Sequence, residues 1–247
     1  MLDRFSGAAA AYSLRYLSKP TKYSPVVKVR RSLDNTEQDF TAGEIEDGTL
    51  EAFVGAGNDG FVTTWYDQSG NGNDATQTTA ASQPKIVDAG VLVTENGKAA
   101  VDFDGVDDFF RCNVGGVKAI YSVFSDSGNA VDFVGPTQNR IFLDKNNFEI
   151  QPLSPFITIS LPINYLDGRY FLLAYNNNPT DTLSLNGDTY SDPDAPNQEF
   201  ALNRIGNNDS NLGYVNGVFS EIIIYPSDQS ANRVAIETNI NNHYEIY

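Results

Sequence analysis

Short runs of alternating apolar and polar residues cover most of the chain after Gly60, and clusters of Gly, Asn and Asp separate them. Such alternation indicates strands with one buried face, because successive side chains of a strand point to opposite sides. Asn96-Gly97 and Asn186-Gly187 stand between apolar runs and predict tight hairpin turns, since both residues tolerate a positive φ. The expected strands are Val26–Arg30, Phe61–Tyr66, Val91–Val93, Ala99–Phe103, Ala119–Phe124, Arg140–Leu143, Phe148–Ile150, Phe156–Ser160, Tyr170–Tyr175, Thr182–Leu185, Phe200–Ile205 and Gly217–Tyr225, with Val101–Phe110 as two pieces around Asp104-Gly105. The regular spacing of these strands and turns predicts an all-β sandwich.

Two short helices are expected before the strands begin. Ala8–Leu17 is rich in alanine and other good helix formers, and Leu50–Val54 is a shorter candidate. The first 60 residues are therefore interpreted as an N-terminal decoration with short helices, placed beside the sandwich of residues 61–226.

A third helix is expected at the C-terminus, in residues 227–247. Val234, Ile236 and Ile240 recur there at helical spacing, so we expect all three to be buried against the sheet. Ser230 is the expected N-cap, because its hydroxyl can accept from a free backbone amide. The 247 residues read as one domain, since all-β domains often reach this length.

The formal charge of −16 restricts the partners of the protein. It excludes binding to nucleic acid and to anionic membranes, which both require clustered cations. Cys112 is the one cysteine, so there is no disulfide framework. The N-terminus lacks the pattern of a secretory signal, and no apolar stretch is long enough to span a membrane. Assembly into a virus particle would place such a protein outside a cell without a signal.

Several blocks of sequence resemble a known family. They are Ala11–Arg15 (AYSLR), Val29–Asp39 (VRRSLDNTEQD), Trp65–Asn73 (WYDQSGNGN), Phe103–Asp108 (FDGVDD) and Arg204–Ser227. The first three together resemble the catalytic domain of fungal-type α-L-arabinofuranosidase B, and even more a group of bacteriophage and prophage proteins that carry this module on the virion. The last two blocks are similar to laminin-G-like domains in general. The resemblance implies a concanavalin A-like jelly-roll sandwich with short N-terminal helices and a C-terminal helix.

The resemblance also indicates where catalysis would take place. Retaining glycosidases use two carboxylates about 5–5.5 Å apart. The acid/base aspartate of the family corresponds to Asn208 in the segment 205–210, and an amide cannot exchange the proton. Asp209 is one residue away, and a shift of one residue turns a side chain to the other face of a strand. Asp209 and Glu221 are therefore weak catalytic candidates. The favoured interpretation of Glu149 and Glu221 is that of solvated strand positions. The sequence thus favours a non-enzymatic role.

Carbohydrate binding requires aromatic faces beside side chains that bond to hydroxyls. Two segments have this composition, although Trp65 is a residue type that is more often buried. The candidate residues for binding a sugar are Trp65, Tyr66, Asp67, Gln68, Asn207, Asn208, Asp209 and Tyr214. His243 has no Ser or Cys partner pattern and is interpreted as a surface or helix-end residue.

Two groups of oxygen ligands are weak candidates for a Ca²⁺ site. One is Asp102, Asp104 and Asp107, with Asp108 beside them, and the other is Asp67, Asn71, Asn73 and Asp74. Neither has the spacing of an EF-hand loop, and such residues also cap turns. Turn capping is the favoured interpretation, so no cofactor is predicted.

The sequence thus favours a structural bacteriophage protein, such as a tail, spike or head-fibre subunit, whose lectin-like sandwich contacts host glycan. We expect it on the virion surface after synthesis in the host cytoplasm, with other virion proteins and copies of itself as partners. A glycoside hydrolase of arabinofuranosidase type and a cellular carbohydrate-binding module are the alternatives.

Overall fold

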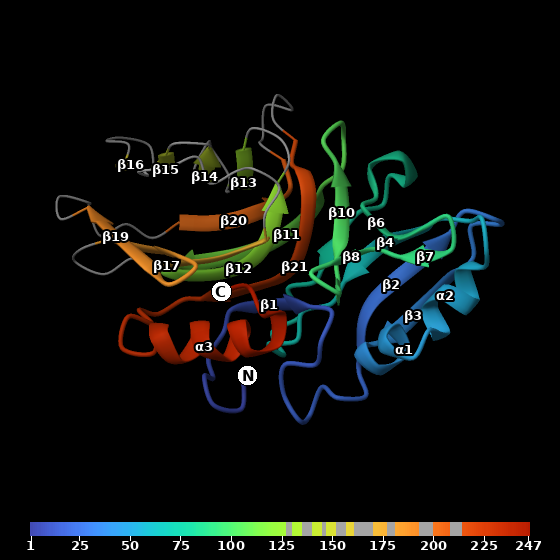
Figure 1. The fold of residues 1–247 in the computed structure, drawn as a ribbon, viewed down its shortest axis with the longest axis horizontal. Coiled ribbons are helices and arrows are strands. Elements are labelled where there is room, and N and C mark those ends of the chain that lie inside the picture. The colour runs from blue at the N-terminus through green and yellow to red at the C-terminus, as the bar shows by residue number, and fades with distance from the viewer. Residues whose placement is uncertain are drawn as a thin grey trace.

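The computed structural model describes residues 1–126, 130–134, 140–144, 147–151, 157–160, 170–176, 181–192, 200–207 and 214–247. Nineteen strands form one curled sheet with antiparallel pairings, and a separate two-stranded hairpin lies beside it (Figure 1). The all-β sandwich that the sequence predicts is confirmed. No helix in these described ranges is both long and apolar enough to cross a membrane.

The elements follow one another in this order along the chain. The earlier strands are β1 (Ala10–Ser13), β2 (Pro25–Arg31), β3 (Glu37–Thr41), β4 (Gly60–Trp65), β5 (Ala75–Thr76), β6 (Lys85–Asp88), β7 (Val91–Leu92), β8 (Thr94–Glu95), β9 (Lys98–Ala99) and β10 (Val101–Asp104). The later strands are β11 (Phe110–Val117), β12 (Ala119–Asp126), β13 (Ala130–Val134), β14 (Arg140–Asp144), β15 (Asn147–Gln151), β16 (Ile157–Ser160), β17 (Tyr170–Asn176), β18 (Asp181–Leu185), β19 (Asp188–Asp192), β20 (Phe200–Ile205) and β21 (Asn216–Tyr225). The helices are α1 (Ala42–Glu46), α2 (Thr49–Val54), the 3₁₀ turn η1 (Ala80–Ser82) and α3 (Arg233–Tyr244).

Strand β21 is the centre of one layer. It pairs with β12 along one edge and with β1 and β10 along the other, and β17, β18 and β19 continue beyond β12. The second layer runs from β11 through β20 and β13 to β16. Strand β4 joins the two by pairing with β5 and β6, and it carries the N-terminal strands β2 and β3 beside it.

Two apolar clusters lie on opposite faces of the β21 layer. Ile222 and Ile224 point into the larger cluster between the layers, which includes Trp65. Ile223 and Tyr225 point the other way, into a cluster that α3 covers (Figure 1). Because both faces are buried, this strand is apolar almost without interruption, as is usual for strands covered on two sides.

The predicted helix at Ala8–Leu17 is wrong, because β1 forms there. Ala10 and Tyr12 belong to one apolar cluster and Ala11 to the other, so the strand is buried on both faces. Pairing with Ile222–Ile224 of β21 satisfies its backbone. Helix propensity is a weak preference, and this tertiary pairing outweighs it.

The other two helices are confirmed with changes in detail. The candidate Leu50–Val54 is α2, while α1 was not predicted although Thr41 and Glu44 form a complete capping box at its start. Helix α3 begins after Asn232, not at Ser230, whose hydroxyl instead donates to Asp228.

The buried face of α3 is only partly the predicted one. Ile236 and Ile240 are fully buried, as expected, but Val234 is 63% exposed. Tyr244, which was not in the predicted set, completes the buried face of the helix.

Most predicted strands are confirmed where the structure describes them, and both Asn-Gly turns are confirmed by their backbone angles. Asn96 and Gly97 have φ of 50° and 71°, and Asn186 and Gly187 have 49° and 87°. Seven strands were not predicted as strands, namely β1, β3, β5, β6, β8, β13 and β19. The second piece of Val101–Phe110 begins only at Phe110. Phe156, the first residue of one predicted strand, lies outside the described residues.

Candidate functional site

The side chains of Asp67 and Gln68 bind the protein's own backbone. Asp67 accepts hydrogen bonds from the amides of Ala11 at 2.8 Å, Ser69 at 2.8 Å and Asn73 at 3.0 Å. The Gln68 amide donates to the carbonyl oxygens of Ser13 and Arg15, both at 3.0 Å, and its oxygen accepts from the amide of Leu17 at 2.9 Å. The WYDQSGNGN block therefore fastens β1 and the segment after it to β4. In the second group of candidate metal ligands, the carboxylates of Asp67 and Asp74 cap backbone amides of the turn.

The two aromatic candidates of this block differ in exposure. Trp65 has no exposed surface and packs against Tyr12 and Phe110, with ring centroids 5.9 Å and 6.2 Å away. Tyr66 is partly exposed, and its hydroxyl donates to Asp39 at 2.7 Å. Burial and the Asp39 carboxylate raise the pKa of Tyr66. Of this pair, Tyr66 alone offers surface to a sugar, and its role in binding stays a prediction.

The second candidate segment is only partly described. Asn207 is buried, accepts from Arg204 Nη1 at 2.9 Å and forms an antiparallel bridge with Tyr214, which is partly exposed. Asn208 and Asp209, on which the prediction against catalysis depends, lie outside the described residues. The side chain of Glu149 is also outside them. The sequence-based interpretation of all three therefore stays a prediction.

The predicted calcium ligands are brought together in part. Carboxylate oxygens of Asp104, Asp107 and Asp108 lie within 4.8 Å of one another, whereas Asp102 lies on β10 opposite Lys85 and outside this group. Asp104 accepts from the amide of Asp107 at 3.2 Å, and Asp108 accepts from the amide of Asp104 at 3.0 Å. Burial, followed by the neighbouring aspartates, raises the pKa of Asp108 to about 7. These carboxylates accept from backbone amides of the turn, and a Ca²⁺ site here stays a weak candidate.

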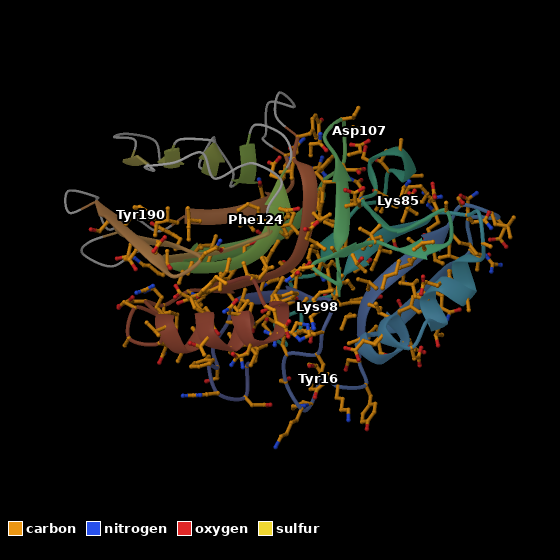
Figure 2. The ribbon with its side chains drawn as sticks, viewed as in Figure 1. Tyr16, Lys85, Lys98, Asp107, Phe124 and Tyr190 are labelled. Carbon is orange, nitrogen blue, oxygen red and sulfur yellow. The ribbon has the colours of Figure 1, made fainter. Side chains whose placement is uncertain are left out.

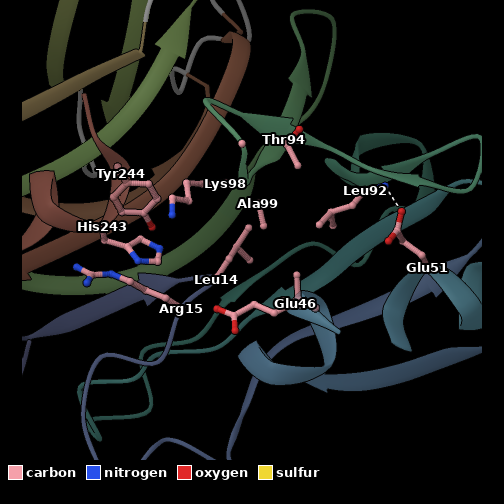
Figure 3. Close-up of a pocket in the computed structure, with 12 residues that line it drawn as sticks. Leu14, Arg15, Glu46, Glu51, Leu92, Thr94, Lys98, Ala99, His243 and Tyr244 are labelled. Atoms are coloured by element: carbon pink, nitrogen blue, oxygen red, sulfur yellow. Dashed lines mark hydrogen bonds between the residues drawn. The ribbon is translucent and has the colours of Figure 1, made fainter. Parts of the chain in front are cut away.

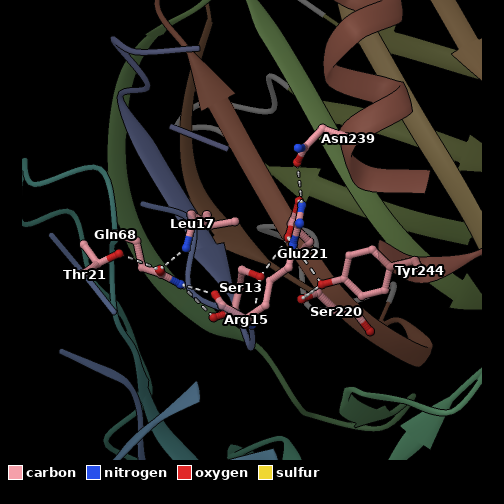
Figure 4. Close-up of polar contacts among 9 residues, drawn as sticks. All are labelled: Ser13, Arg15, Leu17, Thr21, Gln68, Ser220, Glu221, Asn239 and Tyr244. Carbon is pink, nitrogen blue, oxygen red and sulfur yellow. Dashed lines mark hydrogen bonds and ion pairs between the residues drawn. The ribbon is translucent and has the colours of Figure 1, made fainter. Parts of the chain in front are cut away.

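Glu221 lies at the centre of a buried polar cluster (Figure 4). Its carboxylate has no exposed surface and forms two bonds with Arg15, Nε–Oε2 at 2.8 Å and Nη2–Oε1 at 2.9 Å. Ser13 Oγ donates to Oε2 at 2.8 Å, and the hydroxyl of Tyr244 lies 3.3 Å from it. Burial alone would raise the pKa of Glu221, but the Arg15 guanidinium more than offsets this and the pKa lies below its usual value.

The prediction that Glu221 is a solvated strand position is wrong. The register of β1 on β21 places Ser13 opposite Glu221, and Arg15 follows two residues later. A charged partner more than 200 residues away leaves no local signal in the sequence. The one available hint was the apolar run Ile222–Ile224, which indicates a strand buried on both faces.

A cavity of about 340 Å³ lies beside this cluster, between α1, α2, the β8–β9 hairpin and the end of α3 (Figure 3). Arg15 and Tyr244 belong to both the cluster and the cavity wall. The lining residues are Leu14, Arg15, Ile45, Glu46, Glu51, Leu92, Thr94, Gly97, Lys98, Ala99, His243 and Tyr244. They come from four separate parts of the chain, so sequence reasoning missed the cavity as a whole.

His243 lies at the end of α3, as predicted, but it is partly buried and faces this cavity (Figure 3). Burial, followed by the charges of Arg15 and Lys98, lowers the pKa of His243 to about 4. The imidazole is therefore neutral at pH 7, so one ring nitrogen donates and the other accepts. Near it, Lys98 places its ammonium group in the same cavity.

We compared the sequence and the fold with those of known proteins. No protein-family model and no curated protein matches the sequence. The fold is similar to that of α-L-arabinofuranosidases. A GH54 α-L-arabinofuranosidase soaked with a cyclic sulfate inhibitor has a TM-score of 0.65 and 17% identity, and an arabinofuranosidase complexed with arabinofuranosyl-α-1,2-xylobiose has 0.64 and 18%. Each alignment covers 93% of this chain and 62% of that enzyme's chain, so the similarity predicted from the sequence is confirmed for the fold.

Proposed function

We propose that this chain is a carbohydrate-binding β-sandwich. The observation that carries the proposal is the similarity of 93% of the chain to the fold of arabinofuranosidases, one of which is complexed with arabinofuranosyl-α-1,2-xylobiose. Sequence blocks between Ala11 and Asn73 indicated the same relationship independently, and the later blocks indicated laminin-G-like domains in general. A shared fold does not fix a function, so binding has to be measured directly.

A glycan array probed with the fluorescently labelled full chain tests the proposal. We expect binding to a restricted set of glycans, and competition by the same free oligosaccharide in solution. A blank array, together with no binding of soluble oligosaccharides by calorimetry, would overturn it. Binding that free sugar cannot compete would also count against it.

Hydrolysis of arabinofuranosides is a second candidate, and the same structural neighbours support it. The fold places Glu221, one of the two weak catalytic candidates, in a buried ion pair. Turnover of 4-nitrophenyl α-L-arabinofuranoside separates the two functions. We expect none from the native chain, whereas turnover that Asp209→Asn abolishes would establish a hydrolase.

We propose that the protein is located on the surface of a bacteriophage particle. The resemblance of the sequence blocks to phage and prophage proteins supports this location, with other virion proteins and further copies of the chain as partners. Mass spectrometry of purified particles should find the protein in fixed stoichiometry. Its absence from particles would favour a cellular carbohydrate-binding module instead.

A further inference from the structure

We infer that the cavity between α1, α2, the β8–β9 hairpin and α3 is a binding site for one neutral sugar residue. The class of ligand rests on the proposed function, while the position rests on the cavity itself. None of the residues predicted from the sequence to bind sugar lines this space. The site is therefore separate from the WYDQSGNGN block and from the Asn207–Tyr214 bridge.

The size and the floor of the cavity suit a small ligand with apolar edges. Its volume of about 340 Å³ lies at the lower end of the ~300–1,000 Å³ that small-molecule sites occupy. Leu14, Ile45, Leu92 and Ala99 line it with apolar groups. Carbon–hydrogen faces of a sugar ring can pack on such groups while the hydroxyls reach polar atoms at the rim.

Polar groups that the fold leaves available surround this floor. Lys98 and Glu46 form no ion pair and no side-chain hydrogen bond with any residue that the structure describes, although Lys98 is partly buried. Thr94 contributes a hydroxyl from the exposed strand β8. The neutral imidazole of His243 can both donate and accept. Sugar hydroxyls also donate and accept, so this lining matches them.

The charges favour a neutral ligand over an acidic one. The guanidinium of Arg15 is neutralised by Glu221 and bonds to Asn239 as well. Lys98 is then the remaining cation of the lining, and Glu46 and Glu51 contribute two carboxylates to the same lining. Glu51 already accepts from the amide of Leu92 at 2.9 Å. An acidic sugar would meet no net positive charge in this cavity.

The walls of the cavity are held in place before any ligand binds. Asn96, in the turn of the β8–β9 hairpin, donates to the carbonyl oxygens of Tyr244 at 2.7 Å and Glu245 at 3.0 Å. The Arg15–Glu221 pair fixes the wall below α3, and Glu44 completes the capping box of α1 with Thr41. A preformed site loses little conformational entropy when it binds, which favours a small ligand.

Filling the cavity is the first test. Thr94→Trp places a large side chain into the cavity from an exposed position, and Thr189→Trp on the exposed part of β19 is the matched control. The probes are methyl α-L-arabinofuranoside, methyl β-D-galactopyranoside and D-galacturonate, with binding followed by saturation-transfer NMR on the full chain. We expect at least one neutral glycoside to bind the native chain and the control, galacturonate to bind neither, and Thr94→Trp to lose binding.

Removing single polar groups is the second test. We expect Lys98→Met and Glu46→Gln each to weaken binding of the neutral probe by about tenfold, since each removes one charge-assisted hydrogen bond. Lys22→Met and Glu37→Gln make the same changes at positions outside the cavity and should leave binding unchanged.

The outcomes separate the two proposals. A positive glycan array with Thr94→Trp binding as well as the native chain would overturn the cavity site and leave carbohydrate binding standing. Preferential binding of galacturonate would overturn the neutral-ligand assignment. No binding of array glycans, soluble oligosaccharides or small probes would overturn both.

Discussion

Arg15 and Glu221 are separated by 206 positions in the sequence and form one buried, two-bonded ion pair. The Arg15 side chain is 14% exposed and that of Glu221 is fully buried. The pair joins the segment just after β1 to the middle of β21, and its Arg15 side chain forms part of the wall of the cavity. The stability of this region and the shape of the candidate site therefore depend on the same contact.

Glu221→Gln should destabilise the fold strongly. The amide cannot neutralise Arg15, and breaking a buried pair by removing one partner typically costs about 3–5 kcal/mol. Urea denaturation followed by circular dichroism measures the free energy of unfolding. Asp34→Asn, which breaks the exposed pair with Arg31, is the control and should lower that free energy much less, because both partners stay in contact with water. Equal losses in the two variants would contradict the structural role of Glu221.

His243 should make the fold more stable as the pH rises from about 4 to 6.5. The folded-state pKa is lowered to about 4, so in this window the unfolded chain binds a proton that the folded chain does not. His243→Gln should remove this contribution and flatten the dependence of the unfolding free energy on pH. Denaturation curves at several pH values from 4 to 7 give the measurement.

Asp108 should change the pH dependence of stability in the direction opposite to His243. Its folded-state pKa is raised to about 7, so between about 4 and 7 the folded chain holds a proton that the unfolded chain has lost. Stability from this group falls as the pH rises, and Asp108→Asn should remove that fall. If both variants changed the slope in the same direction, the assignment of the two groups would be wrong.

Gln68→Ala should loosen the segment between β1 and β2. The change removes the two hydrogen bonds that Gln68 donates to the carbonyl oxygens of Ser13 and Arg15. It also removes the one that Gln68 accepts from the amide of Leu17. Buried groups left without partners cost about 1–3 kcal/mol, so the unfolding free energy should fall by that amount. Hydrogen exchange should speed up at the Leu17 amide. Gln38→Ala, at an exposed position of β3, should change neither quantity.

Gly217→Ala should be destabilising for a steric reason. A Cβ at this position of β21 would lie 2.1 Å from the carbonyl oxygen of Ser125 on β12, and backbone cannot move aside as a side chain can. Overpacking of this kind costs about 1–3 kcal/mol. Gly115→Ala on β11 has open space around its Cβ and should be neutral or slightly stabilising. Thermal denaturation of the two variants measures the difference.

Local features of the fold could be predicted from the sequence, and long-range ones could not. The turns at Asn96-Gly97 and Asn186-Gly187 depend on residues that tolerate a positive φ, which is a property of the turn itself. The segment around Ala10 has good helix formers, yet it is a strand because β21 lies beside it. Propensity describes the isolated segment, whereas this pairing is decided more than 200 residues later.

The candidate site shows the same division. The composition of Trp65–Gln68 indicated sugar binding, but Trp65 packs in the core and Gln68 binds backbone groups. The cavity residues Glu46, Lys98 and His243 have no common motif, and the fold alone brings them together. A sequence pattern can indicate which chemistry is available, but not which side chains are already used by the fold.

The pairing of β1 with β21 also constrains how the chain can fold. Residues 10–13 leave the ribosome long before the strand they pair with, residues 216–225. Until that later strand has been synthesised, β1 lacks the strand it pairs with and Arg15 lacks the Glu221 carboxylate. Contacts of such large sequence separation slow folding, because the intervening chain has to be ordered first. The pairing of β1 with β21, and the buried ion pair beside it, therefore form only after residues 216–225 have been synthesised.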